Sequence, residues 1–198
     1  MDRQAVRTAW DEVSETYARN RDPNGSDADL IDELLDRLGP APRVLDAGCG
    51  DGARTLANLT DTSVGIDISR EGLELAAETL PNGGLVEADM VSVPVAGDAV
   101  DAVTAYHSVF HVPREEQPAV YEEFARITQP GGWLLMTLPG GRYETVRRGW
   151  MGGRMLFSTP GREQTLRQLD AAGYGEIETT TATDPLGSST EFVFAQLA

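Results

Sequence analysis

The sequence contains no lysine: all 16 of its basic residues are arginines, set against 32 aspartates and glutamates. The formal net charge at pH 7 is therefore −16. A surface with this excess of negative charge repels phosphate backbones and anionic lipids. Nucleic acids and membrane surfaces are therefore poor candidate partners for this protein.

The acidic, lysine-free composition is typical of proteins from halophiles. Molar salt shortens the Debye length to about 3 Å and so screens the repulsion between like surface charges. An acidic protein from an organism of ordinary salinity stays open as the alternative. In either case, the charge affects solubility rather than the reaction.

Cysteine and long apolar runs are also scarce. The single cysteine, Cys49, cannot form an internal disulfide, which favours a reducing cytoplasm. No run of about 18 apolar residues could span a membrane, and residues 1–4 lack the apolar stretch of a signal peptide. We therefore expect a cytoplasmic protein, and its 198 residues are enough for one domain with a substantial core.

The most informative stretch, residues 43–52, reads Arg-Val-Leu-Asp-Ala-Gly-Cys-Gly-Asp-Gly. Apolar residues lead into Asp46, three alternating glycines follow, and residues 53–59 are compatible with a helix. Because glycine lacks a Cβ, the backbone can turn sharply here and a ligand can come close to it. The start of a helix would add unpaired N–H groups. The pattern predicts a buried strand, a ligand-binding turn and a helix.

A second combination of strand and acid occurs at residues 64–69, where Asp67 follows Asp46 by 21 positions. In nucleotide-binding α/β folds, an acid at the end of the second strand holds the ribose hydroxyls. The glycines do not have the G-x-G-x-x-G spacing of dinucleotide-binding proteins. This counts against an NAD-dependent oxidoreductase, which stays open as a rival enzyme class.

Residues 44–52 resemble motif I of class I S-adenosylmethionine (SAM) methyltransferases, and the resemblance extends over residues 41–138. It implies a methyl-transferring enzyme with SAM as cofactor and S-adenosylhomocysteine as product. It also implies that Asp89, after the third strand, bonds the adenine amino group and that Met90 lies against the ring. The cofactor-binding residues that we expect on this basis are Asp46, Gly48, Cys49, Gly50, Asp67, Ile68, Asp89, Met90, Tyr106 and Tyr17.

Two of these residues have simpler interpretations. Tyr17 follows Trp10 and Val13 on one face of the first predicted helix, so an ordinary packing role stays open beside a ligand contact. Cys49 is a small packing residue of the turn rather than a nucleophile, because nothing next to it in the sequence would activate it.

The order of predicted elements indicates an α/β fold. We expect a single Rossmann-like doubly wound sheet of about seven strands, mostly parallel, with a C-terminal antiparallel hairpin and helices on both faces. Further helices are expected from Ser26 or Asp27, Ser69, Pro113 and Thr159-Pro160, and residues 139–153 are expected to be an irregular loop. Turn signals occur at residues 22–25 and 184–189.

These elements suggest one domain over residues 1–198, without an internal repeat or a linker. Residues 1–40 would form an N-terminal helical cap, and residues 41–138 the cofactor-binding core. Residues 139–198 would supply a substrate-side segment and the C-terminal strands.

Methyl transfer is an in-line displacement in which the protein aligns the acceptor, and it requires no metal. We find no metal-ligand cluster in the sequence. The candidate catalytic residue is His107, which follows the fourth predicted strand and could accept a proton from an O–H or N–H group. A purely structural role for His107 stays open, and His111 is expected to be structural.

The acceptor is expected to be a small molecule methylated at oxygen or nitrogen, because the acidic surface disfavours polyanions. Trp150, Met155 and Phe157 would give a lid over the site an apolar inner surface. An anionic group on the acceptor could meet an arginine of the same segment, although each of these could equally be solvated: Arg142, Arg147 or Arg148.

Two other functions stay open at this point. One is a SAM-binding sensor or non-catalytic partner subunit, whose mark would be a damaged cofactor motif. The other is a methyltransferase that acts on a protein or RNA. The sequence carries no signal for an oligomeric state.

The charge composition generates a testable prediction: salt should stabilise the fold. Screening of the repulsion that accompanies a net charge of −16 should raise the melting temperature between low and molar KCl. Thermal unfolding followed by circular dichroism measures this. A melting temperature that stays flat or falls over that range would contradict the prediction.

Overall fold

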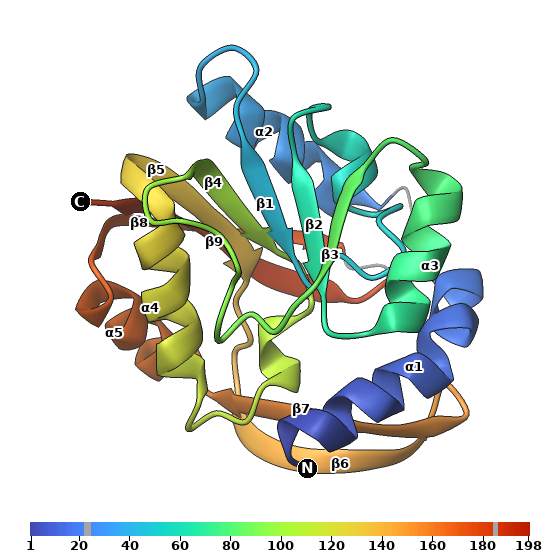
Figure 1. The fold of residues 1–198 in the computed structure, drawn as a ribbon. Helices are drawn as coiled ribbons and strands as arrows, with labels where there is room; N and C mark the ends of the chain where they lie inside the picture. The colour runs from blue at the N-terminus through green and yellow to red at the C-terminus, as the bar shows by residue number, and fades with distance from the viewer. Residues whose placement is uncertain (22–24, 184–185) are drawn as a thin grey trace.

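A seven-stranded sheet forms the centre of the molecule in the computed structural model, which describes residues 1–21, 25–183 and 186–198 (Figure 1). The strand order is β3-β2-β1-β4-β5-β9-β8, and the pairs from β3 to β5 are parallel whereas β9 and β8 join in antiparallel pairs. This confirms the predicted mixed sheet with a C-terminal hairpin. The strands are β1 (Val44–Ala47), β2 (Val64–Asp67), β3 (Gly84–Glu87), β4 (Val100–Ala105), β5 (Thr128–Thr137), β8 (Tyr174–Thr183) and β9 (Ser189–Leu197).

Helices cover both faces of this sheet, as the alternation of elements predicted. The helix α2 (Asp29–Arg37) packs through Ile31 and Leu34 on one face, in a cluster with Leu135 of β5 and Phe194 of β9. The helices α4 (Gln117–Ile127) and α5 (Arg162–Ala171) belong to the cluster on the opposite face. Between β2 and β3 runs α3 (Arg70–Thr79), whose first turn is capped by the Ser69 hydroxyl, as expected.

A further layer lies outside the sheet and consists of α1 (Arg3–Asn20) and a two-stranded hairpin, β6 (Arg142–Trp150) and β7 (Gly153–Pro160) (Figure 1). The apolar face of α1 carries Val6 and Val13, which pack in one buried cluster with Met155 and Phe157 of β7. The N-terminal helix and a late segment of the chain therefore lie together over one edge of the sheet.

The prediction of an irregular loop at residues 139–153 is wrong, because most of this segment forms β6 and the turn to β7. Almost every residue of β6 is exposed, so the segment lacks the apolar alternation that identifies a strand. Its pairing partner β7 supplies the buried residues. The predicted start of the next helix at Thr159-Pro160 is wrong for the same reason, because these two residues end β7. The helix α5 begins at Arg162, after Gly161, whose φ is +91°.

Two other helix predictions are also wrong in their details. Residues 53–59 form turns and one short 3₁₀ helix, η2 (Leu56–Asn58), because Arg54 and Thr55 turn inward to bind Asp27 and Asp46. The helix expected from Pro113 begins four residues later at Gln117, and Pro118 occupies its first turn instead.

The two predicted turns fall partly outside the described residues, which exclude 22–24 and 184–185. The second predicted helix begins as a 3₁₀ turn, η1 (Ser26–Ala28), and its backbone is not capped by the side chain of Ser26 or Asp27. Over the described ranges, none of the helices has the length and apolar character needed to cross a membrane.

Candidate functional site

Two adjoining cavities lie at the carboxyl ends of the parallel strands, where α/β folds bind their ligands. The first, of about 90 Å³, lies between α1 and the ends of β1, β2 and β4. The second, of about 460 Å³, lies between α1, the β6–β7 hairpin and the start of β9. Four side chains line both cavities, so the two meet there: Trp10, Tyr17, His107 and His111.

The glycine turn after β1 is fixed to the end of β2 by its backbone. The Ile66 carbonyl oxygen accepts hydrogen bonds from the N–H groups of Gly48 (2.8 Å) and Cys49 (3.0 Å). Gly48 has a φ of +79°, and a Cβ there would lie only 2.4 Å from the Ser108 Cβ. Glycine is therefore required at this position on both conformational and steric grounds.

Asp67, at the end of β2, faces the first cavity together with Gly50 and Ile68. One carboxylate oxygen accepts the Gly50 N–H and the other accepts the Ser69 N–H, each at 2.8 Å. Burial raises the pKa of Asp67, although these backbone N–H donors act in the opposite direction. Because a carboxylate has about four acceptor positions, two remain for the hydroxyls of a ligand.

Asp46 does not line either cavity; it is 1% exposed and lies beneath the glycine turn. Its two carboxylate oxygens accept hydrogen bonds from the hydroxyls of Thr55 and Thr104, the latter at 2.8 Å. Burial raises the pKa of Asp46 to about 6, and the two hydroxyls only partly offset this effect. Asp46 therefore acts as a support that joins β1, β4 and the turn.

Asp89 also lies outside the first cavity, although Met90 and Ala88 beside it line the wall. Both oxygens of the Asp89 carboxylate pair with the Arg3 guanidinium of α1, in which Nε donates at 2.9 Å. Asp89 instead lines a separate neighbouring cavity of about 250 Å³ with Arg3 and Arg7. In this conformation, Asp89 could bind the adenine amino group only if Arg3 shared or released its carboxylate.

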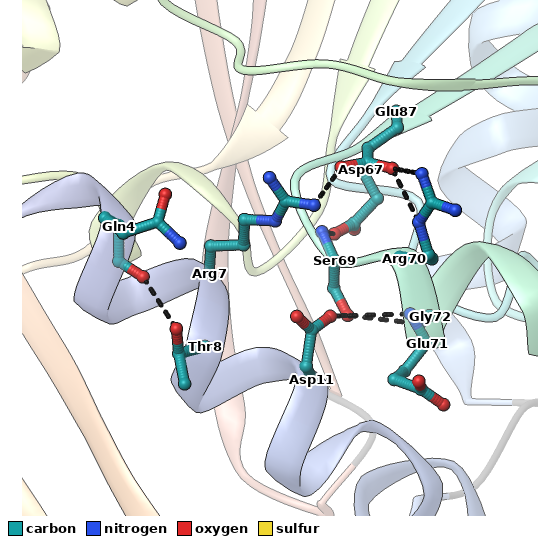
Figure 2. Close-up of polar contacts among 10 residues, drawn as sticks. All are labelled: Gln4, Arg7, Thr8, Asp11, Asp67, Ser69, Arg70, Glu71, Gly72 and Glu87. Atoms are coloured by element: carbon teal, nitrogen blue, oxygen red, sulfur yellow. Dashed lines mark hydrogen bonds and ion pairs between the residues drawn. The ribbon is translucent and has the colours of Figure 1, made fainter.

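The helix α1 is attached to the strand ends by several polar contacts (Figure 2). Arg7 pairs with Glu87 of β3, which Arg70 of α3 also binds. Asp11 accepts a hydrogen bond of 2.7 Å from the Ser69 hydroxyl, next to the backbone N–H that Asp67 holds. The helix therefore forms a roof over the end of β2.

His107 occupies the junction of the two cavities in a left-handed backbone conformation, with a φ of +51°. Its N–H donates to the Thr137 hydroxyl at 2.8 Å, which fixes this conformation. The ring nitrogen Nε2 lies 3.4 Å from a carboxylate oxygen of Asp27, which is 0% exposed and paired with the buried Arg54. Such a carboxylate can orient the imidazole and leave its other nitrogen for a proton.

Tyr106 lines the first cavity, and its hydroxyl donates to the Asp27 backbone carbonyl at 2.9 Å. Tyr17 and Cys49 line it as well. Burial raises the pKa of Cys49 well above its ordinary value, so the thiol stays protonated and behaves as a packing group.

Three of the four predicted acceptor residues line the second cavity: Arg147, Trp150 and Phe157. The fourth, Met155, is fully buried against α1 and lies outside both cavities. Met155 is covered by the apolar face of α1, with which it packs in one cluster through Val6, Ala9 and Val13.

Sequence reasoning missed several residues of the site. Asp27 and Arg54 pair with each other although they are 27 positions apart in the sequence. Arg21 reaches the first cavity from the end of α1, where it pairs with Asp51. Phe110 and Tyr143 contribute rings to the second cavity. The sequence gives little sign of these residues, because they are aromatic or charged side chains that belong to no recognisable motif.

Comparisons with known proteins show similarity to methyltransferases. Residues 45–136 match the family model described as a methyltransferase domain. The chain is 36% identical over 118 residues to methyltransferase GfsG of Streptomyces halstedii, a match that covers 54% of this chain and 42% of that protein. It is 30% identical over 167 residues to a ubiquinone biosynthesis O-methyltransferase of Dechloromonas aromatica, covering 81% and 66% of the respective chains.

A solved structure has a similar fold: SAM-bound CalS10, an amino pentose methyltransferase from Micromonospora echinaspora. The TM-score is 0.65 at 22% identity, over 86% of this chain and 89% of that one. At this identity, the likeness establishes the fold alone. The chain spans less than half the length of GfsG, so the activity of that whole protein is not carried over to this one.

Asp46 generates a prediction about the pH dependence of stability. Its folded-state pKa of about 6 lies above the ordinary value of 3.8, so the folded protein binds the extra proton between these values. The contribution of Asp46 to the free energy of unfolding should therefore fall by about 2 kcal/mol as the pH rises from 4 to 7. Asp46→Asn should lack this loss, and the difference in unfolding free energy between variant and wild type should grow with pH.

Urea unfolding of both proteins at several pH values measures this difference. The comparison is needed because burial lowers the pKa of His111 to about 4, which makes stability rise with pH over part of the same range. His111 is unchanged in the variant, so its effect cancels. A pH-independent difference between the two proteins would contradict the assignment to Asp46.

Proposed function

We propose, from the match of residues 45–136 to the methyltransferase domain model, that the protein is a class I SAM-dependent methyltransferase. We further propose that it transfers the methyl group to an oxygen or nitrogen of a small molecule. The observation that carries the proposal is the junction of the two cavities at His107. One cavity has the groups that hold a nucleoside, and the other has room for an acceptor.

The first cavity fits the cofactor by its chemistry. Asp67 presents a carboxylate to hydroxyl groups, as a ribose requires, and its two backbone bonds fix its orientation. A Cβ at Gly50 would meet no atom within 4 Å, so the turn leaves open space in front of its backbone. Met90 and Ile68 supply an apolar wall for a base, and Tyr17 and Tyr106 border the same space.

The cofactor is SAM, and it supplies a methyl group activated on a sulfonium sulfur. The protein contributes position: the roof formed by α1 excludes water, and the strand ends hold the site rigidly. The acceptor oxygen or nitrogen forms the new bond to the methyl carbon while the sulfur–carbon bond breaks and its electron pair stays on sulfur. His107 takes the proton that the acceptor loses, and Asp27 keeps the imidazole oriented.

The rival functions have less support. An NAD-dependent oxidoreductase would need a different glycine spacing. A sensor or partner subunit would not need a histidine held in a left-handed conformation between two cavities, an arrangement that costs free energy. A protein or RNA acceptor would need a flat, open face, whereas the second cavity is a recess of about 460 Å³ between α1, the β6–β7 hairpin and the start of β9.

Removing the ribose acceptor tests the cofactor site. Asp67→Ala should weaken binding of S-adenosylhomocysteine by about 1.5–3 kcal/mol, or roughly 10- to 150-fold, because charged acceptors of hydrogen bonds contribute this much. Calorimetry measures the affinity. Asp61→Ala, which removes an equal charge from an exposed turn, should leave it unchanged.

Two results of these binding measurements would contradict different claims. Unchanged affinity in Asp67→Ala would remove Asp67 from the site. Tight binding of NAD without binding of SAM would refute the proposed function as a whole.

The role of His107 is tested with His107→Asn, since asparagine tolerates the left-handed backbone that this position adopts. Transfer of label from methyl-labelled SAM to the low-mass fraction of a cell extract serves as the assay. A general base contributes about 10²–10⁴-fold, so labelling should slow by that factor. Affinity for S-adenosylhomocysteine should not change; an unaffected rate would leave His107 with a structural role only.

A further inference from the structure

Aromatic side chains are scarce in this protein, yet they gather around the second cavity. The chain has three Trp, five Tyr and five Phe, or 7% of its residues. Two of each type line this one cavity, and both histidines of the chain lie there too. The six aromatic residues are Trp10, Tyr17, Phe110, Tyr143, Trp150 and Phe157.

The rings form a connected wall rather than a filled core. Trp10 meets Trp150 edge to face at 5.6 Å, and Trp150 meets Phe157 in the same way at 5.5 Å. Phe110 and Phe157 stack with centroids 5.9 Å apart. The space that they border is about 460 Å³, within the usual range for small-molecule sites. Planar rings suit such walls, because aromatic pairs favour offset-stacked and edge-to-face geometries.

His111 does not add positive charge to this wall at neutral pH. His111 is buried and its Nδ1 lies 2.7 Å from the Leu156 carbonyl, to which it donates as a neutral ring. Burial lowers its pKa to about 4, so it stays uncharged at neutral pH. It therefore acts as another flat ring of the wall.

Among the described residues, the charged side chains that line the cavity are Arg147 and Glu191. The Glu191 carboxylate already has a partner, because Arg162 binds both of its oxygens at 2.9–3.0 Å. The Arg147 guanidinium lies 4.3 Å from the centre of the Phe157 ring. Among the described residues, no carboxylate pairs with Arg147, although acids outnumber arginines two to one in the sequence.

A guanidinium stacked on a ring keeps its N–H groups at the edge of the stack, where they can bind a carboxylate. From this arrangement we propose that the second cavity binds a planar aromatic acceptor that carries a carboxylate, with the ring against the Trp150–Phe157 wall and the carboxylate at Arg147. The inference rests on the proposed function and names the acceptor class of the same site. A cationic acceptor would also suit an aromatic wall, but Arg147 would repel it.

The experiment uses three probes that share one ring system: 3-hydroxy-2-naphthoate, 2-naphthol and 2-naphthylmethylammonium. Calorimetry measures the affinity of each for the full-length protein, with and without S-adenosylhomocysteine. We expect the naphthoate to bind at least 10-fold more tightly than the naphthol, and the ammonium to bind more weakly than either.

Two neighbouring arginines provide a matched pair of variants. Arg147 and Arg148 are adjacent in β6, so their side chains lie on opposite faces of the hairpin, and only Arg147 lines the cavity. Both are exposed, so neither substitution should prevent folding, which melting temperatures verify. Arg147→Gln should weaken naphthoate binding at least 10-fold and naphthol binding less than 2-fold, whereas Arg148→Gln should change neither by more than 2-fold.

Each outcome decides the inference. Equal losses in the two variants would indicate a general charge effect and overturn it. So would tighter binding of the ammonium than of the naphthoate, or the absence of binding by any probe. A protein that binds the naphthoate through Arg147 but does not bind S-adenosylhomocysteine would instead refute the proposed function while leaving the anionic aromatic site in place.

Discussion

The site depends on one backbone carbonyl, that of Ile66, which accepts hydrogen bonds from both Gly48 and Cys49. These two bonds hold the glycine turn level with the end of β2, and the N–H of Gly50 then reaches the Asp67 carboxylate. Because all three donors belong to the main chain, the arrangement requires only that the turn has the correct conformation. Gly48 provides it, since no Cβ fits against Ser108. The buried Asp46 carboxylate supports the turn from below through two threonine hydroxyls, at the cost of a raised pKa.

The second cavity has a different origin, because it lies between layers rather than at the end of a sheet. The helix α1 packs its apolar face on β7, while its charged side chains bind β3 and α3 (Figures 1 and 2). This places Trp10 and Tyr17 opposite Trp150 and Phe157, which are more than 130 positions away in the sequence. The same helix therefore covers the strand ends and supplies rings to the neighbouring cavity. His107 is the point at which both spaces meet.

Arginine carries all of the positive charge in this chain, and the structure uses it in two ways. Most arginines pair with carboxylates, including the inaccessible pair of Arg54 with Asp27 beside His107. An inaccessible pair of this kind is costly to break because the remaining charge would be desolvated without a partner. Arg147 instead stacks on a ring at the cavity, an arrangement that suits the planar guanidinium better than an ammonium. A strongly acidic protein can therefore present a positive group at its second cavity.

The sequence by itself determined the parallel core of the sheet, its antiparallel C-terminal pair and the position of the cofactor-type residues at the strand ends. These follow from short-range signals: apolar runs that end in Asp46 and Asp67, and glycines that adopt backbone conformations other residues rarely adopt. Only the tertiary structure decided that residues 142–160 form a hairpin, that Arg3 pairs with the Asp89 carboxylate, and that Asp27 and Arg54 lie beside His107. The exposed strand β6 has no apolar pattern of its own, and the contacts of Arg3 and Asp27 join segments about 80 positions apart. Such contacts leave no local periodicity in the sequence, because they depend on how the packed layers bring distant segments together.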